Sequence, residues 1–228
     1  MKLGILSLDT AFPRIPGDVG APETYPFPCE VLVVDGADST KVVQDGPPTP
    51  DLVENFISAA QTLEARGATA LVSTCGFLVS VQAQIAAAVS IPVMLSALSL
   101  YPMARIACPG RIGIMTASRA SLGPNALAAA GIDPEMAEIS GMDDSKLFSS
   151  TFLAPRSAQL REFSREAMER DVVAAARDLV RRGNGLSAVI LECGNLPPYA
   201  AAIRAETGLP VFHLADAAHS LVRAGARS

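Results

Sequence analysis

The chain has 228 residues, of which 50% are hydrophobic, so it is long enough to bury the core of one large domain or of two closely fused smaller ones. Its net charge is −5 and its 18 Lys and Arg residues are scattered, which excludes the basic stripe that nucleic-acid binding needs. These properties predict a folded, acidic protein rather than a disordered or fibrous one.

Strand-sized apolar runs alternate with helix-like segments along the chain. Strands are expected at 3–8, 31–34, 70–73, 93–95, 112–115, 188–191 and 211–213, and helices at 51–66, 78–89, 118–130, 158–182 and 199–207. This alternation predicts an α/β fold with a mainly parallel sheet covered by helices. The stretch 12–28 is rich in proline and glycine and is expected to form a long loop over the carboxyl edge of the sheet, where such sheets bind ligands.

Two segments of the chain carry the same pattern. Residues 70–76 read ALVSTCG and residues 188–194 read AVILECG, each an apolar strand that runs into Cys-Gly. In both segments a proline, Pro92 or Pro210, follows 17 residues after the cysteine, and the apolar runs that open the two halves are also alike. The offset of 118 residues that the cysteines and the prolines share indicates an internal repeat.

The repeat predicts two pseudosymmetric domains, each a mainly parallel sheet flanked by helices. We expect residues 1–108 together with 210–228 to form the first half, and residues 109–209 to form the second. If the halves pack about a pseudo-twofold axis, equivalent strand ends face each other, and the active site lies in the cleft between them.

Cys75 and Cys193 follow equivalent strands and are the predicted catalytic residues. A thiolate on one face of a substrate and a thiol on the other can remove a proton from a carbon atom and return one from the opposite side. Each cysteine lies where a strand ends and a helix is expected, so backbone N–H groups and the helix dipole are expected to lower the pKa of its thiol. A single cysteine after an apolar strand is more often an inert core thiol, but the repeated placement favours function.

The other cysteines and the histidines do not share this pattern. Cys29 and Cys108 lie in a loop and in a turn and are expected to be structural. His213 and His219 have no cysteine or carboxylate at ligand spacing, so no metal site is expected, although His213 ends the last strand and could face the cleft. The sequence also lacks the glycine-rich nucleotide-binding motifs, and we expect no cofactor.

The two cysteine motifs resemble those of the aspartate/glutamate/hydantoin racemase superfamily. The first motif is Ser-Thr-Cys-Gly-Phe at 73–77, and the second is Leu-Glu-Cys-Gly-Asn-Leu-Pro-Pro-Tyr at 191–199. The pseudosymmetric layout extends the resemblance over nearly the whole chain. The resemblance implies proton transfer by two thiols without a cofactor.

The resemblance also implies substrate contacts beside the motifs. Asp9 and Thr10 look like the Asp-Ser pair of glutamate racemases, and the segment 116–118 looks like the loop that binds a substrate carboxylate. The complete set of predicted substrate-binding residues is Asp9, Thr10, Arg14, Thr74, Gly76, Phe77, Thr116, Ala117, Ser118, Glu192, Gly194, Asn195 and Tyr199.

This chain also departs from the racemase pattern. Amino-acid racemases usually place Asn and Thr after the first cysteine and Thr after the second, where this chain has Gly76-Phe77 and Gly194-Asn195. Arg14 lies in a loop that is foreign to glutamate racemases, and it is either a carboxylate clamp or a solvated charge.

Two further residues of the second motif have alternative roles. Glu192 orients the thiol beside it, exchanges a proton with it, or pairs with an arginine. Tyr199 either points its hydroxyl into the cleft or only packs in the core.

Three functions compete. We expect a racemase or epimerase that acts on an amino acid, a hydantoin or a related small carboxylate, because this reaction uses both thiols. The alternative is a lyase, isomerase or decarboxylase, since the superfamily includes arylmalonate decarboxylases, maleate isomerases and algal dimethylsulfoniopropionate lyases. A decarboxylase of this type keeps only the second cysteine, so Cys75 counts against it. A binding protein without turnover is the third possibility, and both thiols argue against it.

Location and partners are predicted from composition. The chain starts without the apolar run of a signal peptide and has four cysteines, so we expect a cytoplasmic protein with reduced thiols. The stretch between Arg66 and Arg105 has no charged residue, but proline, glycine and serine interrupt it, which favours the buried interface of a homodimer or higher homo-oligomer over a membrane span. The expected partner is a small carboxylate substrate, with neither nucleic acid nor membrane.

Overall fold

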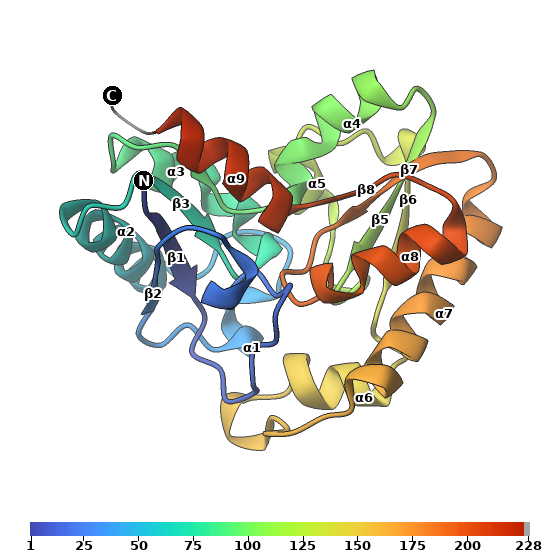
Figure 1. Ribbon diagram of the computed structural model, residues 1–228, viewed down its shortest axis with the longest axis horizontal. Coiled ribbons are helices and arrows are strands. Elements are labelled where there is room, and N and C mark those ends of the chain that lie inside the picture. Colours follow the sequence, from blue (N-terminus) through green and yellow to red (C-terminus); the bar gives the residue numbers. More distant parts are fainter. Residues whose placement is uncertain (226–228) are drawn as a thin grey trace.

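The protein contains two four-stranded parallel sheets, one from each half of the chain (Figure 1). The computed structural model describes residues 1–225. The first sheet has the order β2-β1-β3-β4, with β1 at Leu3–Ser7, β2 at Cys29–Val33, β3 at Ala70–Ser73 and β4 at Val93–Met94. The second has the order β6-β5-β7-β8, with β5 at Arg111–Thr116, β6 at Ala137–Gly141, β7 at Leu186–Leu191 and β8 at Val211–His213. The predicted α/β fold with two pseudosymmetric sheets is confirmed.

The internal repeat is visible in the register of the two sheets. In the first sheet Ala70 of β3 pairs with Leu3 of β1, and in the second Ala188 of β7 pairs with Ile112 of β5. The carbonyl of each repeat proline accepts a hydrogen bond from the strand beside it, at 2.9 Å in the first half and 2.8 Å in the second. The two halves therefore place their matching cysteines at the same edge of equivalent sheets.

Helices cover both sheets. Their bounds are α1 Ser39–Val42, α2 Pro50–Ala65, α3 Gln82–Ala87, α4 Tyr101–Ala107, α5 Pro124–Ala129, α6 Lys146–Phe148, α7 Arg165–Gly183, α8 Ala200–Thr207 and α9 Leu214–Ala224. Helix α7 begins where the Ser164 hydroxyl accepts a hydrogen bond from the backbone N–H of Ala167, and it buries Met168, Val172 and Leu179 on one face. This apolar face contacts β5 and β6 and so fixes the second sheet beneath the helix.

The helix at the end of each half crosses to the other sheet. Helix α4 follows β4 but contacts β5, and α9 follows β8 but contacts β3 and β4, as Figure 1 shows. The expected boundary assigns residues 210–228 to the first half. In the structure β8 belongs to the second sheet, because Val211 of β8 pairs with Val189 of β7. Only α9, after that strand, returns to the first half.

Some expected elements differ in the structure. The sequence does not predict the edge strand β6, because its residues are only partly buried and show no clear apolar alternation. The helix expected at 118–130 is shortened to α5, since Ser118 donates a hydrogen bond to Asp143 and accepts one from the N–H of Ser121, which holds the first residues in a turn. Helix α7 likewise begins later than expected, at Arg165.

The charge-free stretch folds into β3, α3, β4 and most of α4. Among residues 1–225, no helix combines the length and the apolar character needed to cross a bilayer. On α4, Met103 and Ile106 leave 50% and 83% of their surface exposed. The homo-oligomer expected from this stretch stays a prediction.

Candidate active site between the two sheets

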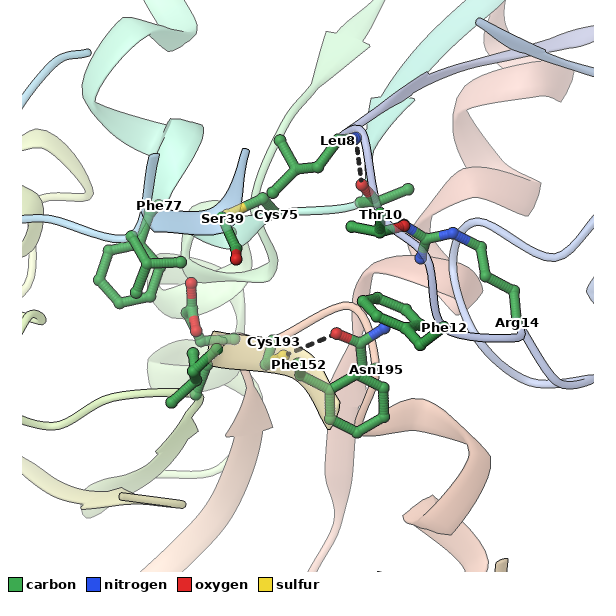
Figure 2. A pocket seen from close by; sticks show the side chains of 16 residues that line it. Leu8, Thr10, Phe12, Arg14, Ser39, Cys75, Phe77, Phe152, Cys193 and Asn195 are labelled. Carbon is green, nitrogen blue, oxygen red and sulfur yellow. Dashed lines mark hydrogen bonds between the residues drawn. The ribbon is translucent and has the colours of Figure 1, made fainter. Parts of the chain in front are cut away.

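Cys75 and Cys193 line one cavity between the two halves (Figure 2). Each lies two residues beyond the end of its strand, β3 or β7, and each is 7% exposed. Cys75 also precedes the short helix Gly76–Val81. The cavity is small, with a volume of about 30 Å³. The repeat thus delivers one thiol from each half to a shared site.

The wall of the cavity combines predicted and unpredicted residues. Those that the sequence predicted are Thr10, Arg14, Thr74, Cys75, Gly76, Phe77, Ala117, Glu192, Cys193 and Asn195. Those that it did not assign to the site are Leu8, Phe12, Ser39, Val43, Phe152 and Leu153. Most of the second group are apolar and come from loops or short helices far from the cysteine motifs, so no local pattern marks them.

Two predicted residues support the wall from behind. Thr116, at the end of β5, donates a hydrogen bond of 2.8 Å from its hydroxyl to Oε2 of Glu192. Gly194 accepts a hydrogen bond at its carbonyl from the N–H of Val19, and a Cβ at this glycine would lie 2.6 Å from the carbonyl oxygen of Thr74. Gly194 is therefore needed for the close approach of the two halves.

Other predicted contacts lie away from the cavity. Asp9 forms an ion pair with Arg156 at 2.7 Å, and the Ser118 hydroxyl bonds to Asp143. Tyr199 is 1% exposed and packs in the core. His213 accepts a hydrogen bond from the N–H of Asp216 through Nδ1 and does not reach the cavity.

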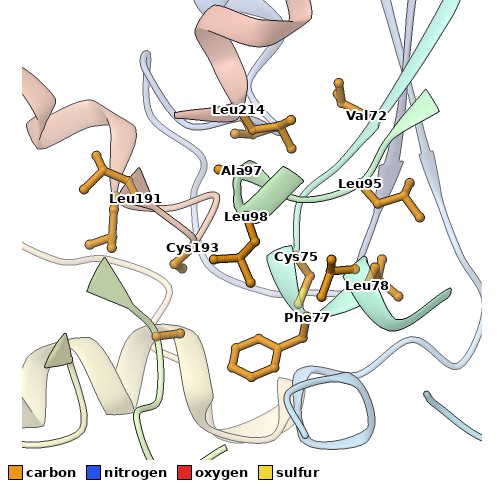
Figure 3. Close-up of a cluster of buried hydrophobic side chains, with 14 of the residues drawn as sticks. Val72, Cys75, Phe77, Leu78, Leu95, Ala97, Leu98, Leu191, Cys193 and Leu214 are labelled. Carbon is orange, nitrogen blue, oxygen red and sulfur yellow. The ribbon is translucent and has the colours of Figure 1, made fainter. Parts of the chain in front are cut away.

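An apolar turn at Ala97–Leu100 packs behind the two cysteine motifs (Figure 3). It contacts β7 and β8 of the second sheet as well as the helix Gly76–Val81 of the first half. Leu98 is fully buried in the same hydrophobic cluster as both cysteines. This packing surrounds the thiols with apolar groups on the side away from the cavity.

Glu192 is a buried carboxylate in the cavity wall. It is 2% exposed and precedes Cys193 at the end of β7. Thr116 bonds to Oε2 of the carboxylate, but Oε1 has no hydrogen-bond partner among residues 1–225. Burial raises the pKa of Glu192 to about 7, and the hydrogen bond from Thr116 partly opposes this shift. The arginine partner considered as an alternative is not found in this part of the chain.

The predicted lowering of the thiol pKa values is wrong. Burial, followed by the nearby negative charge of Glu192, raises the pKa of Cys75 to about 12. Hydrogen bonds from the backbone of Phe77 and Leu78 act in the expected direction but are outweighed. The pKa of Cys193 is also raised well above its usual range by the same two causes. Desolvation therefore overrides the helix N-terminus, and both thiols are protonated at neutral pH.

The loop that follows β1 is tied to the second thiol through buried polar groups. Arg14 forms an ion pair with Asp18 at 2.8 Å, and Asp18 accepts a hydrogen bond of 2.6 Å from the side-chain amide of Asn195. The Oδ1 atom of Asn195 then accepts a contact of 3.6 Å from the Cys193 thiol, drawn in Figure 2. The sequence did not identify Asp18, because one acid in an irregular loop gives no signal of its partners.

The fold and the site together define a pseudosymmetric α/β protein in which each half supplies one buried thiol to a shared cleft. Residues 26–222 match the family described as Asp/Glu/Hydantoin racemase. The chain belongs to this family.

Two relatives match almost the whole chain. A dimethylsulfoniopropionate lyase of Durusdinium sp. clade D is 30% identical over 97% of this chain and 74% of its own length. Dimethylsulfoniopropionate lyase 3 of Emiliania huxleyi is 29% identical over 97% of this chain, which spans 59% of that relative.

Solved structures share the fold at low identity. A glycine-to-cysteine mutant of arylmalonate decarboxylase superposes with a TM-score of 0.64 at 16% identity, covering 100% of this chain and 95% of that chain. Glutamate racemase from Thermus thermophilus gives a TM-score of 0.55 at 20% identity, covering 97% of this chain and 79% of that chain. At these identities the likeness shows the fold and not the reaction.

Proposed function

We propose that this protein is a cofactor-independent enzyme that moves a proton at a carbon atom next to a carboxylate, with Cys75 and Cys193 as its acid–base groups. The observation that carries the proposal is that two buried thiols from equivalent strand ends line one small cavity. A thiol pair in this arrangement can remove a proton from one side of a bound carbon acid and supply one from the other.

We further propose that the reaction is an elimination. The relatives that match most of the chain are named dimethylsulfoniopropionate lyases. On such a substrate, a thiolate takes a proton from the carbon next to the carboxylate, and that C–H electron pair forms the new C=C bond. The bond between carbon and sulfur breaks, and dimethyl sulfide leaves with its electron pair. The products are acrylate and dimethyl sulfide, and the thiolate has become a thiol.

Arg14 is the proposed anchor for the substrate carboxylate, because it is the cationic side chain in the described cavity wall. Its guanidinium is 2.8 Å from Asp18 and lies 5.1 Å from the Phe12 ring centroid, so it is held in place before a substrate arrives. The backbones of Phe77 and Leu78 act to lower the pKa of Cys75, which favours the thiolate that the reaction needs.

A racemase or epimerase is the second candidate, and the presence of both thiols favours it. Its first step would be the same, but the second thiol would then return a proton to the opposite face of an amino acid, a hydantoin or a related carboxylate. The two reactions differ only in the fate of the carbanion: elimination needs a leaving group on the next carbon, and racemisation does not.

The experiment incubates the protein with 3-(dimethylsulfonio)propanoate and follows dimethyl sulfide by gas chromatography and acrylate by proton NMR. In parallel, L-aspartate, L-glutamate and a 5-substituted hydantoin are incubated in deuterated water, and loss of the α-proton signal and optical rotation are recorded. Release of both elimination products supports the lyase. Deuterium incorporation with loss of optical rotation supports the racemase instead. If neither occurs, or if Cys75→Ser and Cys193→Ser retain full activity, the two-thiol mechanism is wrong.

A further inference from the structure

The side-chain amide of Asn195 lies between the second thiol and a buried acid. Its Nδ2 atom donates a hydrogen bond of 2.6 Å to Oδ2 of Asp18, and its Oδ1 atom is 3.6 Å from the Cys193 sulfur, as the dashed line in Figure 2 marks. Both Asp18 and Asn195 are buried, so the two contacts are largely removed from water. A polar connection therefore runs from the loop after β1 to Cys193.

The carboxylate of Asp18 fixes which end of the Asn195 amide faces the thiol. Its Oδ1 atom is occupied by the Arg14 guanidinium at 2.8 Å and by the backbone N–H of Gly20 at 2.6 Å. Its Oδ2 atom faces Asn195, and an ionised carboxylate accepts hydrogen bonds but donates none. The amide nitrogen must consequently point at Asp18, which leaves the amide oxygen to face the sulfur.

An oxygen acceptor beside a sulfur atom favours the thiol over the thiolate. The S–H group of Cys193 can donate to the amide oxygen of Asn195, whereas a thiolate would face the negative end of the amide dipole. Burial and Glu192 are the main causes of the raised pKa of Cys193, and the negative charge of Asp18 adds to them. The backbone of Asn195 acts in the opposite direction. The side chains of Asn195 and Asp18 thus both favour a protonated Cys193.

The first thiol has different surroundings. Burial and then Glu192 raise the pKa of Cys75 to about 12, while the backbone of Phe77 and the positive charge of Arg14 act to lower it. Arg14 and Cys75 line the same cavity. The buried ion pair of Arg14 with Asp18 therefore has opposite effects on the two thiols, because its positive end favours the Cys75 thiolate and its negative end disfavours the other one.

We propose that Asp18 is a positioning residue that acts through Asn195 to keep Cys193 protonated, which leaves Cys75 as the base of the thiol pair. This inference rests on the proposed function and bears on which of its two reactions occurs. In the elimination, the Cys75 thiolate takes the proton from carbon and becomes a thiol, while Cys193 keeps its own proton. A racemase that acts on both enantiomers needs each thiol as the base in turn. Two unequal thiols therefore suit the elimination better.

The test measures how readily each cysteine forms a thiolate. Iodoacetamide alkylates the thiolate rather than the thiol, and both cysteines line the same cavity, so the reagent reaches them by the same path. The protein is treated at pH 9 without substrate, and the modified peptides are quantified over time by mass spectrometry. The readout is the alkylation rate of Cys75 divided by that of Cys193. For the wild-type protein we expect a ratio of about ten or more.

Asp18→Asn keeps the size of the side chain and removes its charge. The new amide can accept or donate, so Asn195 is no longer held in one orientation and can turn its NH₂ group toward Cys193. An N–H donor stabilises the thiolate, and the ratio should fall about tenfold or more. Asp9→Asn is the matched control, because it makes the same change at an acid of the same loop whose partner, Arg156, lies away from the cavity. This control should keep the wild-type ratio.

Asn195→Ala separates the orientation of the amide from the charge of Asp18. It keeps the ion pair of Arg14 with Asp18, removes the acceptor and opens space for water, which can donate to a thiolate. The ratio should fall, but by less than in Asp18→Asn. Cys29 and Cys108 report on folding in every variant, because a loss of the fold exposes all four thiols alike.

The ratio also separates positioning from a loss of packing. The proposal is overturned if the wild-type ratio is one or less, or if a folded Asp18→Asn or Asn195→Ala protein keeps the wild-type ratio. It is also overturned if Asp18→Asn accelerates both thiols equally, as a looser cleft would do. No substrate is present, so the expected ratios together with a failed elimination assay would reject the proposed reaction alone. Elimination with unchanged ratios would reject only the role of Asp18.

Discussion

Glu192 occupies the space that a side chain at Gly76 would need. A Cβ at Gly76 would lie 2.3 Å from Oε1 and 2.4 Å from the backbone carbonyl oxygen of Glu192. The residue after the first thiol and the residue before the second are thus matched across the cleft. This contact requires glycine at position 76, because a Cβ there would meet both the side chain and the backbone carbonyl of Glu192.

Gly76→Ala should therefore destabilise the protein and displace the carboxylate. Overpacking of this kind costs about 1 to 3 kcal/mol, which corresponds to a fall of roughly 2 to 12 °C in Tm for a chain of this size. Differential scanning calorimetry measures the shift. If the variant has the Tm of the wild-type protein, Glu192 can move away from position 76 without a loss of stability, and the close contact between these two residues is not required.

Cys75→Ser and Cys193→Ser should each reduce turnover by about 100-fold or more, because a hydroxyl is a much poorer acid–base group than a thiol. Cys29 and Cys108 provide matched controls, since they lie outside the cavity wall, and Cys29→Ser and Cys108→Ser should leave the rate unchanged. Initial rates with the substrate that the elimination and racemisation assays find active are the measurement. Equal losses in all four variants would point to a general effect on folding rather than to two catalytic thiols.

Asp18→Ala should be much more damaging than Asp9→Ala. The ion pair of Asp18 with Arg14 is buried, with side chains 4% and 14% exposed, so removing one partner is expected to cost about 3 to 5 kcal/mol. The pair of Asp9 with Arg156 is 40% and 52% exposed and should contribute at most about 1 kcal/mol. Urea unfolding of both variants compares the two costs. Similar values would contradict the role of Asp18 as the buried link between the loop and Asn195.

Glu192→Gln should change how stability depends on pH. The pKa of Glu192 rises from 4.5 to about 7 on folding, so between these values the folded state binds more protons than the unfolded state. The stabilisation is complete below pH 4.5 and is lost as the pH rises through 7, by on the order of 3 kcal/mol. The variant lacks this loss and should gain stability relative to the wild-type protein from pH 4 to pH 8. Urea unfolding at both pH values measures the free energy of unfolding of the variant and of the wild-type protein. If the difference between the two proteins is the same at pH 4 and pH 8, burial does not raise the pKa of Glu192.

Much of the site followed from the sequence because its parts are repeated locally. The strands that carry Cys75 and Cys193 are short apolar runs with a fixed relation to a later proline, and residues adjacent to a strand end stay adjacent in space. The wall residues Ser39 and Phe152 could not be found in this way. They reach the cavity only because short helices from opposite halves meet there, and such long-range contacts leave no periodic signal.

The sequence by itself determined the two α/β halves, the placement of one cysteine at the same strand end of each, and the glycines that follow both thiols. The tertiary structure alone decided that α4 and α9 cross to the opposite sheets, that Asp18 links the loop to Asn195, and that burial raises the pKa values of both thiols and of Glu192. The physical reason is that strand and helix periodicity is a property of neighbouring residues, whereas desolvation and ion pairing depend on everything that packs around a group.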